Sequence, residues 1–275
     1  MTAGDVIGTG ICSLEARQGA SFDGTDDYIL ADAHAVARVA ANDTTGTYSA
    51  WIFVDNNTIS QTILSSGDFN VDEYLQFHLS SDLLSIKVTV AGVTKFETRQ
   101  VTANIPSNKW THVAIVQDGI QPALYVNGLK VTTSNITATN LTDWYDELTG
   151  CDKFAIGILE RNGTHVSDFA GMISDVKYWN KPLTAAEILA DYKGEALSDD
   201  GTYLQLHLLK YGSLTDVGLG ANDGTLTGNA YLNGYGSEWS RKIDLSGAVV
   251  ADNITSVAVS DGYKRGAISA IVKAA

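Results

Sequence analysis

Alternation of apolar and polar residues with a period of two constrains this chain more than any other feature. Successive side chains of a β-strand point to opposite faces, so such a segment buries one row and leaves the other polar. The clearest segments are TYSAWIFV (47–54), EYLQFHLS (73–80), LLSIKVTV (83–90), KFETRQV (95–101), KFAIGIL (153–159) and GMISDVKYW (171–179). Because they follow one another without intervening helices, they predict an all-β sandwich or a closed barrel.

The stretch KWTHVAIVQDGIQPALYVNGLKV (109–131) predicts two paired strands. Val113 and Ile115 face one side of the first strand, and the alternate row, which begins at Trp110, faces the other. We expect one row to pack between two sheets and the other to line the second face. Asn127 and Gly128 tolerate positive φ and predict a tight turn after the second strand.

One helix is predicted, in LTAAEILADYKG (183–194). Thr184 is the expected N-cap, and Glu187, three residues later, completes a capping box. Gly194 ends the run. The helix is too short for a core element, so we expect it to lie across one edge or end of the sheets.

The composition excludes some functions. The 275 residues include 26 Gly and only 3 Pro, and 32 acidic residues against 18 basic ones give a net charge of −14. Such a charge repels phosphate backbones, which argues against nucleic-acid binding. It favours solubility and also leaves room for a cation site. No apolar run approaches the roughly 20 residues of a membrane span, and the N-terminus lacks the pattern of a secretory signal.

The two cysteines, Cys12 and Cys151, are too few for a disulfide framework or a zinc cluster. A single bridge between them and two free, buried thiols both remain open, and the second is favoured because nothing else in the sequence demands an oxidising compartment.

Six stretches, taken in order, resemble the laminin-G-like and pentraxin-like branch of the concanavalin A-like lectin/glucanase superfamily. They are ASFDGTDDYI, TYSAWIFV, TILSSGDFNVDEYLQFHL, KWTHVAIVQDG, ALYVNGLKV and FAGMISDVKYWNKPLTAAEILADY. The resemblance covers about residues 19 to 194 and implies a jelly-roll β-sandwich of two antiparallel sheets with one short helix.

Two segments that resemble the start of such a domain stand after the helix instead, at 201–209 and 220–232. Circular permutation explains this order if 202–209 pairs within its own chain. The competing account is a truncated tandem repeat recruited into another subunit. The predicted domains are a sandwich over 1–235, possibly permuted, and a strand-forming tail over 236–275 that docks on a sheet edge or an assembly.

Catalysis is not predicted. Glycosidases of this broad class place two carboxylates on alternate positions of one strand, whereas Asp72 and Glu73 are adjacent and point to opposite faces. No nucleophile, zinc or phosphate-binding motif is present, and the five histidines are scattered. The chain is therefore predicted not to be an enzyme.

Calcium is the cofactor that the resemblance allows. In pentraxin-like proteins an acidic pair that opens one strand faces a loop rich in carboxylates and amides. The matching positions are Asp72, Glu73, Glu160, Asn162 and Asp168. Arg161 lies in the same loop and would cancel much of the attraction for an ion, so ordinary solvated loop acids are the alternative.

Two adjacent aromatic residues, Trp144 and Tyr145, stand in the polar loop TNLTDWYDELTG. Sugar rings stack on exposed aromatic faces, so these two are the predicted carbohydrate-binding residues. Burial of one of them in the core is the alternative.

These observations predict a non-catalytic recognition or attachment protein at a virion surface, such as a phage decoration, fibre or spike component. It would bind a glycan or cell-surface polysaccharide and contact other virion proteins through its tail. The alternative is a calcium-dependent carbohydrate-binding module of a secreted, extracellular bacterial protein, and a glycosidase is the third. Homo-oligomerisation is left open.

Overall fold

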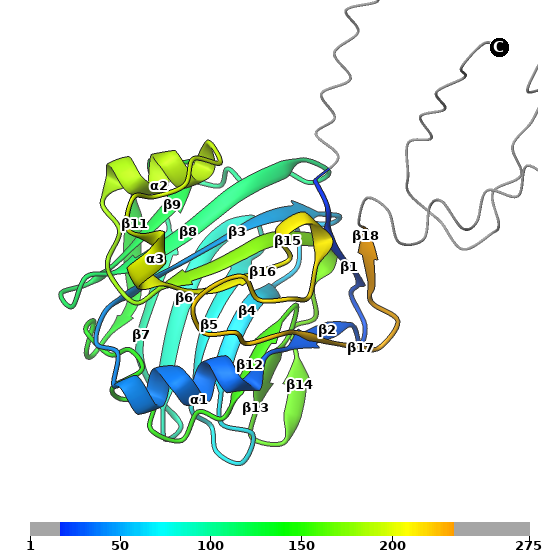
Figure 1. Cartoon of the computed structure of the whole chain (residues 1–275). Coiled ribbons are helices and arrows are strands. Elements are labelled where there is room, and N and C mark those ends of the chain that lie inside the picture. The colour runs from blue at the N-terminus through cyan, green and yellow to red at the C-terminus, as the bar shows by residue number, and fades with distance from the viewer. Residues whose placement is uncertain (1–16, 234–275) are drawn as a thin grey trace, which may run out of the picture. The chain divides into compact units, whose positions relative to one another are not determined.

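The computed structural model describes residues 17–233. The predicted tail over 236–275 and Cys12 lie outside the described residues. Within them the chain forms two large antiparallel sheets and a small third one, shown in Figure 1.

Sheet A has eight strands in the order β10-β9-β8-β3-β15-β1-β18, and β16 also pairs with β15. Its strands are β1 (Gly19–Asp23), β3 (Gly46–Val54), β8 (Trp110–Gln117), β9 (Pro122–Val126), β10 (Leu129–Lys130), β15 (Ala170–Trp179), β16 (Leu204–Leu208) and β18 (Tyr231–Asn233).

Sheet B also has eight strands, in the order β11-β7-β6-β5-β4-β12-β2-β17. They are β2 (Tyr28–Leu30), β4 (Gln61–Gly67), β5 (Tyr74–Ser80), β6 (Leu83–Val90), β7 (Val93–Gln100), β11 (Thr133–Ala138), β12 (Lys153–Ile156) and β17 (Thr225–Thr227). The third sheet is the hairpin β13 (Leu159–Arg161) and β14 (Thr164–Val166).

The inward rows of both sheets share one apolar core, as the alternation predicts. Val113 and Ile115 of β8 lie in it with Phe77 of β5 and Ile86 of β6. The opposite row of β8 contributes Ala114 and Val116 to a second, smaller cluster. Asn127 and Gly128 adopt positive φ (49° and 78°) in the tight turn between β9 and β10, which confirms the predicted turn.

The predicted helix is α2 (Ala185–Tyr192), and both hydrogen bonds of the Thr184–Glu187 capping box are present. Its Ile188 belongs to the smaller cluster together with Trp179 of β15. The helix therefore covers the outer face of sheet A, above β15 and β8 in Figure 1.

Besides the predicted helix, the structure contains a longer helix that the sequence did not predict. The ten-residue α1 (Asp32–Ala41) packs beside β12 and buries His34, Ala35 and Arg38. It begins without a side-chain cap, because Ala31 stands at the N-cap, and its only strong boundary signal is Asn42 in the left-handed conformation after its end. Two shorter elements, α3 (Asp200–Tyr203) and η1 (Lys210–Gly212), flank β16. In the part of the chain described, no helix is long and apolar enough to span a membrane.

The segment after α2 returns to the sandwich. β16 pairs with the second half of β15, whereas β1 pairs with its first half. β17 then adds to β2 and β18 to β1. The pairing of 202–209 within its own chain is what circular permutation requires; the permutation itself stays a prediction.

Candidate functional site

Trp144 and Tyr145 do not form an exposed sugar platform, so their prediction as carbohydrate-binding residues is wrong. Their side chains are 0% and 1% exposed and belong to the main core. The Trp144 indole donates a hydrogen bond to the Tyr178 hydroxyl (3.3 Å), and the hydroxyls of Tyr145 and Tyr48 lie 2.5 Å apart. Because each polar group finds a buried partner, the loop turns both rings inward.

The two loops of the predicted calcium site do lie against each other, since the Asn162 amide donates to the Asp68 carbonyl (3.1 Å). Their side chains, however, have protein partners. Asp72 accepts from the Arg161 guanidinium, and one Glu73 oxygen accepts from the Gly150 amide at 2.7 Å. Arg161 thus neutralises the acid that an ion would need.

The other two predicted acids are Glu160 and Asp168. Glu160 accepts from His165 Nε2 (2.6 Å), and burial raises the pKa of its carboxyl. Burial also raises the pKa of the Asp168 carboxyl, and the negative charges of Asp26 and Asp23 raise it further. Among the described residues, no three of the four predicted acids have oxygens within 4.8 Å of one another.

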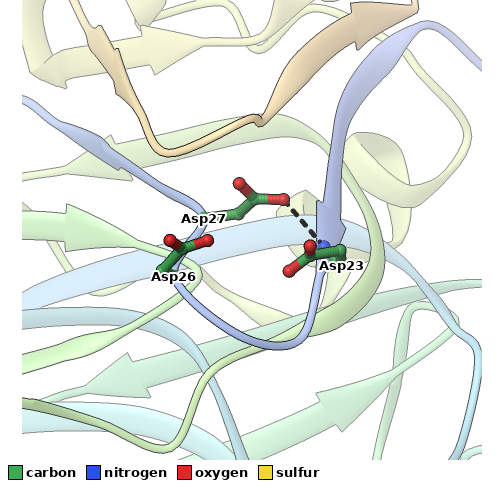
Figure 2. Close-up of side chains that lie close together, drawn as sticks. All are labelled: Asp23, Asp26 and Asp27. Carbon is green, nitrogen blue, oxygen red and sulfur yellow. Dashed lines mark hydrogen bonds between the residues drawn. The ribbon is translucent and has the colours of Figure 1, made fainter.

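The acids that do converge are Asp23, Asp26 and Asp27, at the turn between β1 and β2, shown in Figure 2. One oxygen from each lies within 4.8 Å of the others. One Asp27 oxygen accepts from the Asp23 amide (2.9 Å), and the other accepts from the Asn229 amide (2.7 Å). Asp27 thereby joins the turn to the segment between β17 and β18.

The electrostatics of this triad suit a hard cation. Asp27 is buried, and desolvation raises the pKa of its carboxyl, with a further rise from the Asp23 and Asp26 charges. Oxygen ligands and clustered negative charge are what Ca²⁺ prefers, so the three side chains fit that ion.

A second site is built on the outer face of sheet B. The inward residues of β5, β6 and β7 belong to the core, so their neighbours in sequence point outward. Strand register places these outward side chains in three rows: Thr62, His78, Ser85 and Arg99; Ser65, Gln76, Lys87 and Glu97; and Tyr74, Thr89 and Thr94. On this outer face of sheet B, which has Asp72 and Arg161 at its edge, Thr62, Ser65 and Ser85 are buried, and the partly exposed side chains are those of Lys87, Thr94, Glu97 and Arg99.

The charges on this face differ from those of the chain as a whole. This face carries three basic side chains, of Lys87, Arg99 and Arg161, and two acidic ones, of Glu97 and Asp72. The complete chain, by contrast, has a net charge of −14. Arg99 pairs with Glu97 and Arg161 with Asp72. Among residues 17–233, Lys87 has no ion-pair partner. Its ammonium lies 5.7 Å from the centre of the Tyr74 ring. The Arg161 guanidinium lies 5.0 Å from the centre of the same ring. The face therefore offers donors and positive charge.

His78 lies in the middle of the face, and only 8% of it is exposed. Desolvation lowers its pKa to about 4, so the imidazole is neutral at physiological pH. Gln76, in the neighbouring row, is 7% exposed and donates to Thr62 Oγ1 (2.8 Å). The central groups are thus held in place, and the partly exposed charged ends of Lys87 and Arg99 surround them.

The sequence carried a signal for this face that the motif search missed. The polar members of the alternating strands β5 to β7 include Lys87 and Arg99, both unusual in so acidic a chain. Their spacing shows which face they share, but only the strand register places Lys87 beside Gln76 and Arg99 beside Ser85.

Known proteins share this architecture. The family profile described as the concanavalin A-like lectin/glucanases superfamily matches residues 23–189. No curated protein matches the sequence.

Three solved structures are similar in fold. The CBM40 of a Ruminococcus gnavus IT-sialidase, bound to alpha2,3 sialyllactose, is 17% identical, with a TM-score of 0.50 over 64% of this chain and 93% of its own. A putative carbohydrate binding protein from Bacteroides ovatus is 18% identical, with a TM-score of 0.54 over 80% and 61%. A leech intramolecular trans-sialidase is 17% identical, with a TM-score of 0.54, and the match covers 65% of this chain and 28% of that one. Because the family profile matches more than half of the sequence, the chain belongs to the concanavalin A-like lectin/glucanases superfamily.

Proposed function

We propose that the chain is a non-catalytic carbohydrate-binding module that holds an anionic glycan on the outer face of sheet B. The observation that carries this proposal is the local excess of positive charge on a polar face of a strongly acidic protein. A carboxylate-bearing sugar offers its charge to Lys87 and Arg99 and its hydroxyls to Thr94 and Glu97, which are the partly exposed groups of this face.

The two arginines add to this argument. The Nε–H groups of Arg99 and Arg161 are buried and have no hydrogen-bond partner among residues 17–233. An unsatisfied buried donor costs about 1–3 kcal/mol, so an oxygen-rich ligand that reorients these side chains would recover that energy. Planar guanidinium groups match carboxylate geometry better than ammonium groups do.

The test is isothermal titration calorimetry with α2,3-sialyllactose, the ligand of the R. gnavus module, followed by an array of uronic-acid glycans. We expect Lys87→Ala to weaken binding about tenfold or more, since hydrogen bonds to charged groups contribute about 1.5–3 kcal/mol. Glu97→Gln should strengthen binding, because it removes a competing negative charge beside Arg99.

Lys130→Ala is the matched control, because Lys130 is an exposed lysine on sheet A. Its affinity should equal that of the wild type, and added salt should weaken wild-type binding. Equal losses in Lys87→Ala and Lys130→Ala would move the site away from sheet B. Absence of binding to every acidic glycan would refute the function itself.

The proposal that the module is non-catalytic is supported by the ion pairs that its carboxylates make. Glycoside hydrolysis needs two carboxyl groups free to exchange protons or to attack the sugar. On the outer face of sheet B, Glu97 and Asp72 are each held by an arginine. Release of sialic acid from sialyllactose by the purified protein, above the rate in buffer, would contradict this part of the proposal.

We propose further that Asp23, Asp26 and Asp27 bind calcium. The ion would relieve the repulsion among three converging carboxylates and tie the β1–β2 turn to the segment at Asn229. A ligand bound only by the folded state raises stability by about 2.7 kcal/mol at one hundred times its dissociation constant. Thermal unfolding with and without CaCl₂ measures this effect.

Asp26→Asn should remove most of the calcium-dependent rise in Tm, since Asp26 is exposed and its replacement leaves the backbone bonds of Asp27 intact. Asp72→Asn is the control, because Asp72 belongs to the calcium ligands predicted from the sequence. This variant should keep the calcium-dependent rise in Tm. The reverse pattern would place the ion at the rim of sheet B instead.

The placement of the module on a virion surface stays a proposal, with a secreted bacterial protein as the alternative. It rests on the strand-forming composition of 236–275. Immunogold labelling of purified particles is the test. Labelling that disappears when 236–275 is deleted would support the virion role, and unlabelled particles would oppose it.

A further inference from the structure

A groove of about 630 Å³ lies on the outer face of sheet A, on the other side of the sandwich from the proposed anionic-glycan site. Its floor is formed by β15 and β16, and its walls by the end of α2, the following loop, α3 and η1 (Figure 1). This volume suits a ligand of two or three sugar rings, because binding pockets for small molecules measure about 300–1,000 Å³.

The charged groups on the floor are already paired with one another. The Lys177 ammonium lies 2.7 Å from an Asp191 oxygen and 3.4 Å from an Asp175 oxygen. The other Asp175 oxygen lies 2.5 Å from His207 Nε2. An ionic ligand that bound at this floor would have to displace one of these partners, at the cost of a buried, unpaired charge; Arg17, Glu195 and Lys210 line the groove around the floor. A neutral hydroxylated ligand need only add hydrogen bonds to the lone pairs that remain on the carboxylates.

Three residues with a left-handed backbone conformation line this groove or lie beside it. Asp175, Leu209 and Tyr211 have positive φ (55°, 58° and 55°), and the last two are the largest side chains in this conformation among the described residues. The Asp175 amide donates to the Leu209 carbonyl (3.3 Å), so two of the strained positions are joined. Asp175 stands in a bulge of β15, which aims its side chain at the groove. Strain of this kind persists at sites where a required geometry outweighs its cost.

The strained turn holds Tyr211 at the edge of the groove, where 76% of the side chain is exposed. The Lys210 ammonium lies 5.6 Å from the centre of the Tyr211 ring. An aromatic face beside a floor of hydrogen-bonding carboxylates is the arrangement that a pyranose requires, since its C–H face stacks on the ring while its hydroxyls reach the polar groups.

We infer that this groove is a second saccharide site, specific for neutral oligosaccharides, with Tyr211 as the stacking platform and Asp175 as a hydroxyl acceptor on the floor. The module would then hold two different glycans on opposite faces, an anionic one on sheet B and a neutral one on sheet A. The inference does not depend on the anionic site, because the two sites share no residue.

Saturation-transfer NMR with lactose, N-acetyllactosamine, maltotriose and cellotriose, followed by calorimetry of the strongest binder, tests the inference. We expect at least one probe to bind. Tyr211→Ala should lower its affinity about tenfold, the loss expected for an aromatic contact, whereas Tyr211→Phe should keep it within about twofold. Since Tyr211 is exposed, neither variant endangers the fold.

Tyr231→Ala is the matched control, because Tyr231 is a partly exposed tyrosine of β18 outside the groove lining. The second site is refuted if no neutral probe binds, if Tyr211→Ala binds as well as the wild type, or if Lys87→Ala alone abolishes binding of the neutral probe. Titration of α2,3-sialyllactose into Tyr211→Ala separates the two proposals. Unchanged affinity there, with loss of the neutral sugar, assigns each ligand to its own face.

Discussion

Trp144 and Tyr145 lie in a polar stretch of sequence but belong to a buried cluster of aromatic rings. Their partners, Tyr48 and Tyr178, come from β3 and β15 of sheet A. The polar atoms of these rings bond one another, so burial leaves none of the four hydroxyl and indole groups unsatisfied. At this scale, partners that are distant in the sequence determine the role of a side chain.

Trp144→Ala should therefore destabilise the protein strongly. Removing a large buried aromatic side chain costs about 3–5 kcal/mol, through lost contacts and the cavity left behind. Urea unfolding followed by circular dichroism measures the difference. Phe69→Ala is the control, since Phe69 is 36% exposed and should cost far less. A loss below about 1 kcal/mol for Trp144→Ala would contradict its place in the core.

His78 should make stability depend on pH. Desolvation lowers its pKa from 6.5 to about 4 in the folded protein. Between these values the unfolded chain binds a proton that the folded chain does not, so stability falls as pH drops from 6.5 toward 4. The complete effect is about 3 kcal/mol. His78→Gln should show a shallower decline in the same window, and parallel curves for the two proteins would exclude this role.

Local signals identified some elements but not others. The alternation of β3, β5, β6, β8 and β15 and the capping box of α2 are encoded by neighbouring residues, and the structure matches them closely. The α1 helix has no side-chain cap, and sequence inspection missed it. The bulge in β15 was not predicted either. Nothing in GMISDVKYW indicates where along β15 the pairing with β1 stops and the pairing with β16 starts.

Thr184→Ala should destabilise α2 by about 1 kcal/mol, the usual cost of losing an N-cap side chain. The Thr184 hydroxyl accepts from the Glu187 amide at 3.3 Å, and Glu187 bonds the Thr184 amide at 2.6 Å in return. Chemical denaturation measures the loss. Thr139→Ala, at an exposed threonine, should change stability by less than about 0.5 kcal/mol. An equal loss in both variants would show that the capping box contributes nothing.

At the scale of the whole molecule, the strands after α2 complete the sandwich. β16 brings Leu206 and Leu208 into the main core, where both are fully buried, and β17 and β18 extend the two sheets. The family profile ends at residue 189, before these strands. They also supply one side of the groove on sheet A and the Asn229 contact to the acidic triad.

A chain that ends after residue 194 should fail to fold. Each buried leucine contributes about 2–5 kcal/mol, so loss of Leu206 and Leu208 alone approaches the entire stability of a typical domain. The measurement is thermal unfolding by circular dichroism. A chain that ends after residue 233 keeps every contact described above and should unfold cooperatively. A cooperative transition in the shorter chain would show that β16 to β18 are dispensable.

The sequence by itself determined the strands β3, β5, β6, β7, β8 and β15 with their inward and outward rows, the turn at Asn127–Gly128 and the capped helix, whereas the predicted strand 153–159 is divided between β12 and β13. These features depend on residues a few positions apart, whose spacing matches the periods of strand and helix. Only the tertiary structure decided that Trp144 is buried, that the converging acids are Asp23, Asp26 and Asp27, and that Tyr211 borders a groove. Burial and convergence result from contacts between segments far apart in the chain, and local spacing carries no record of those contacts.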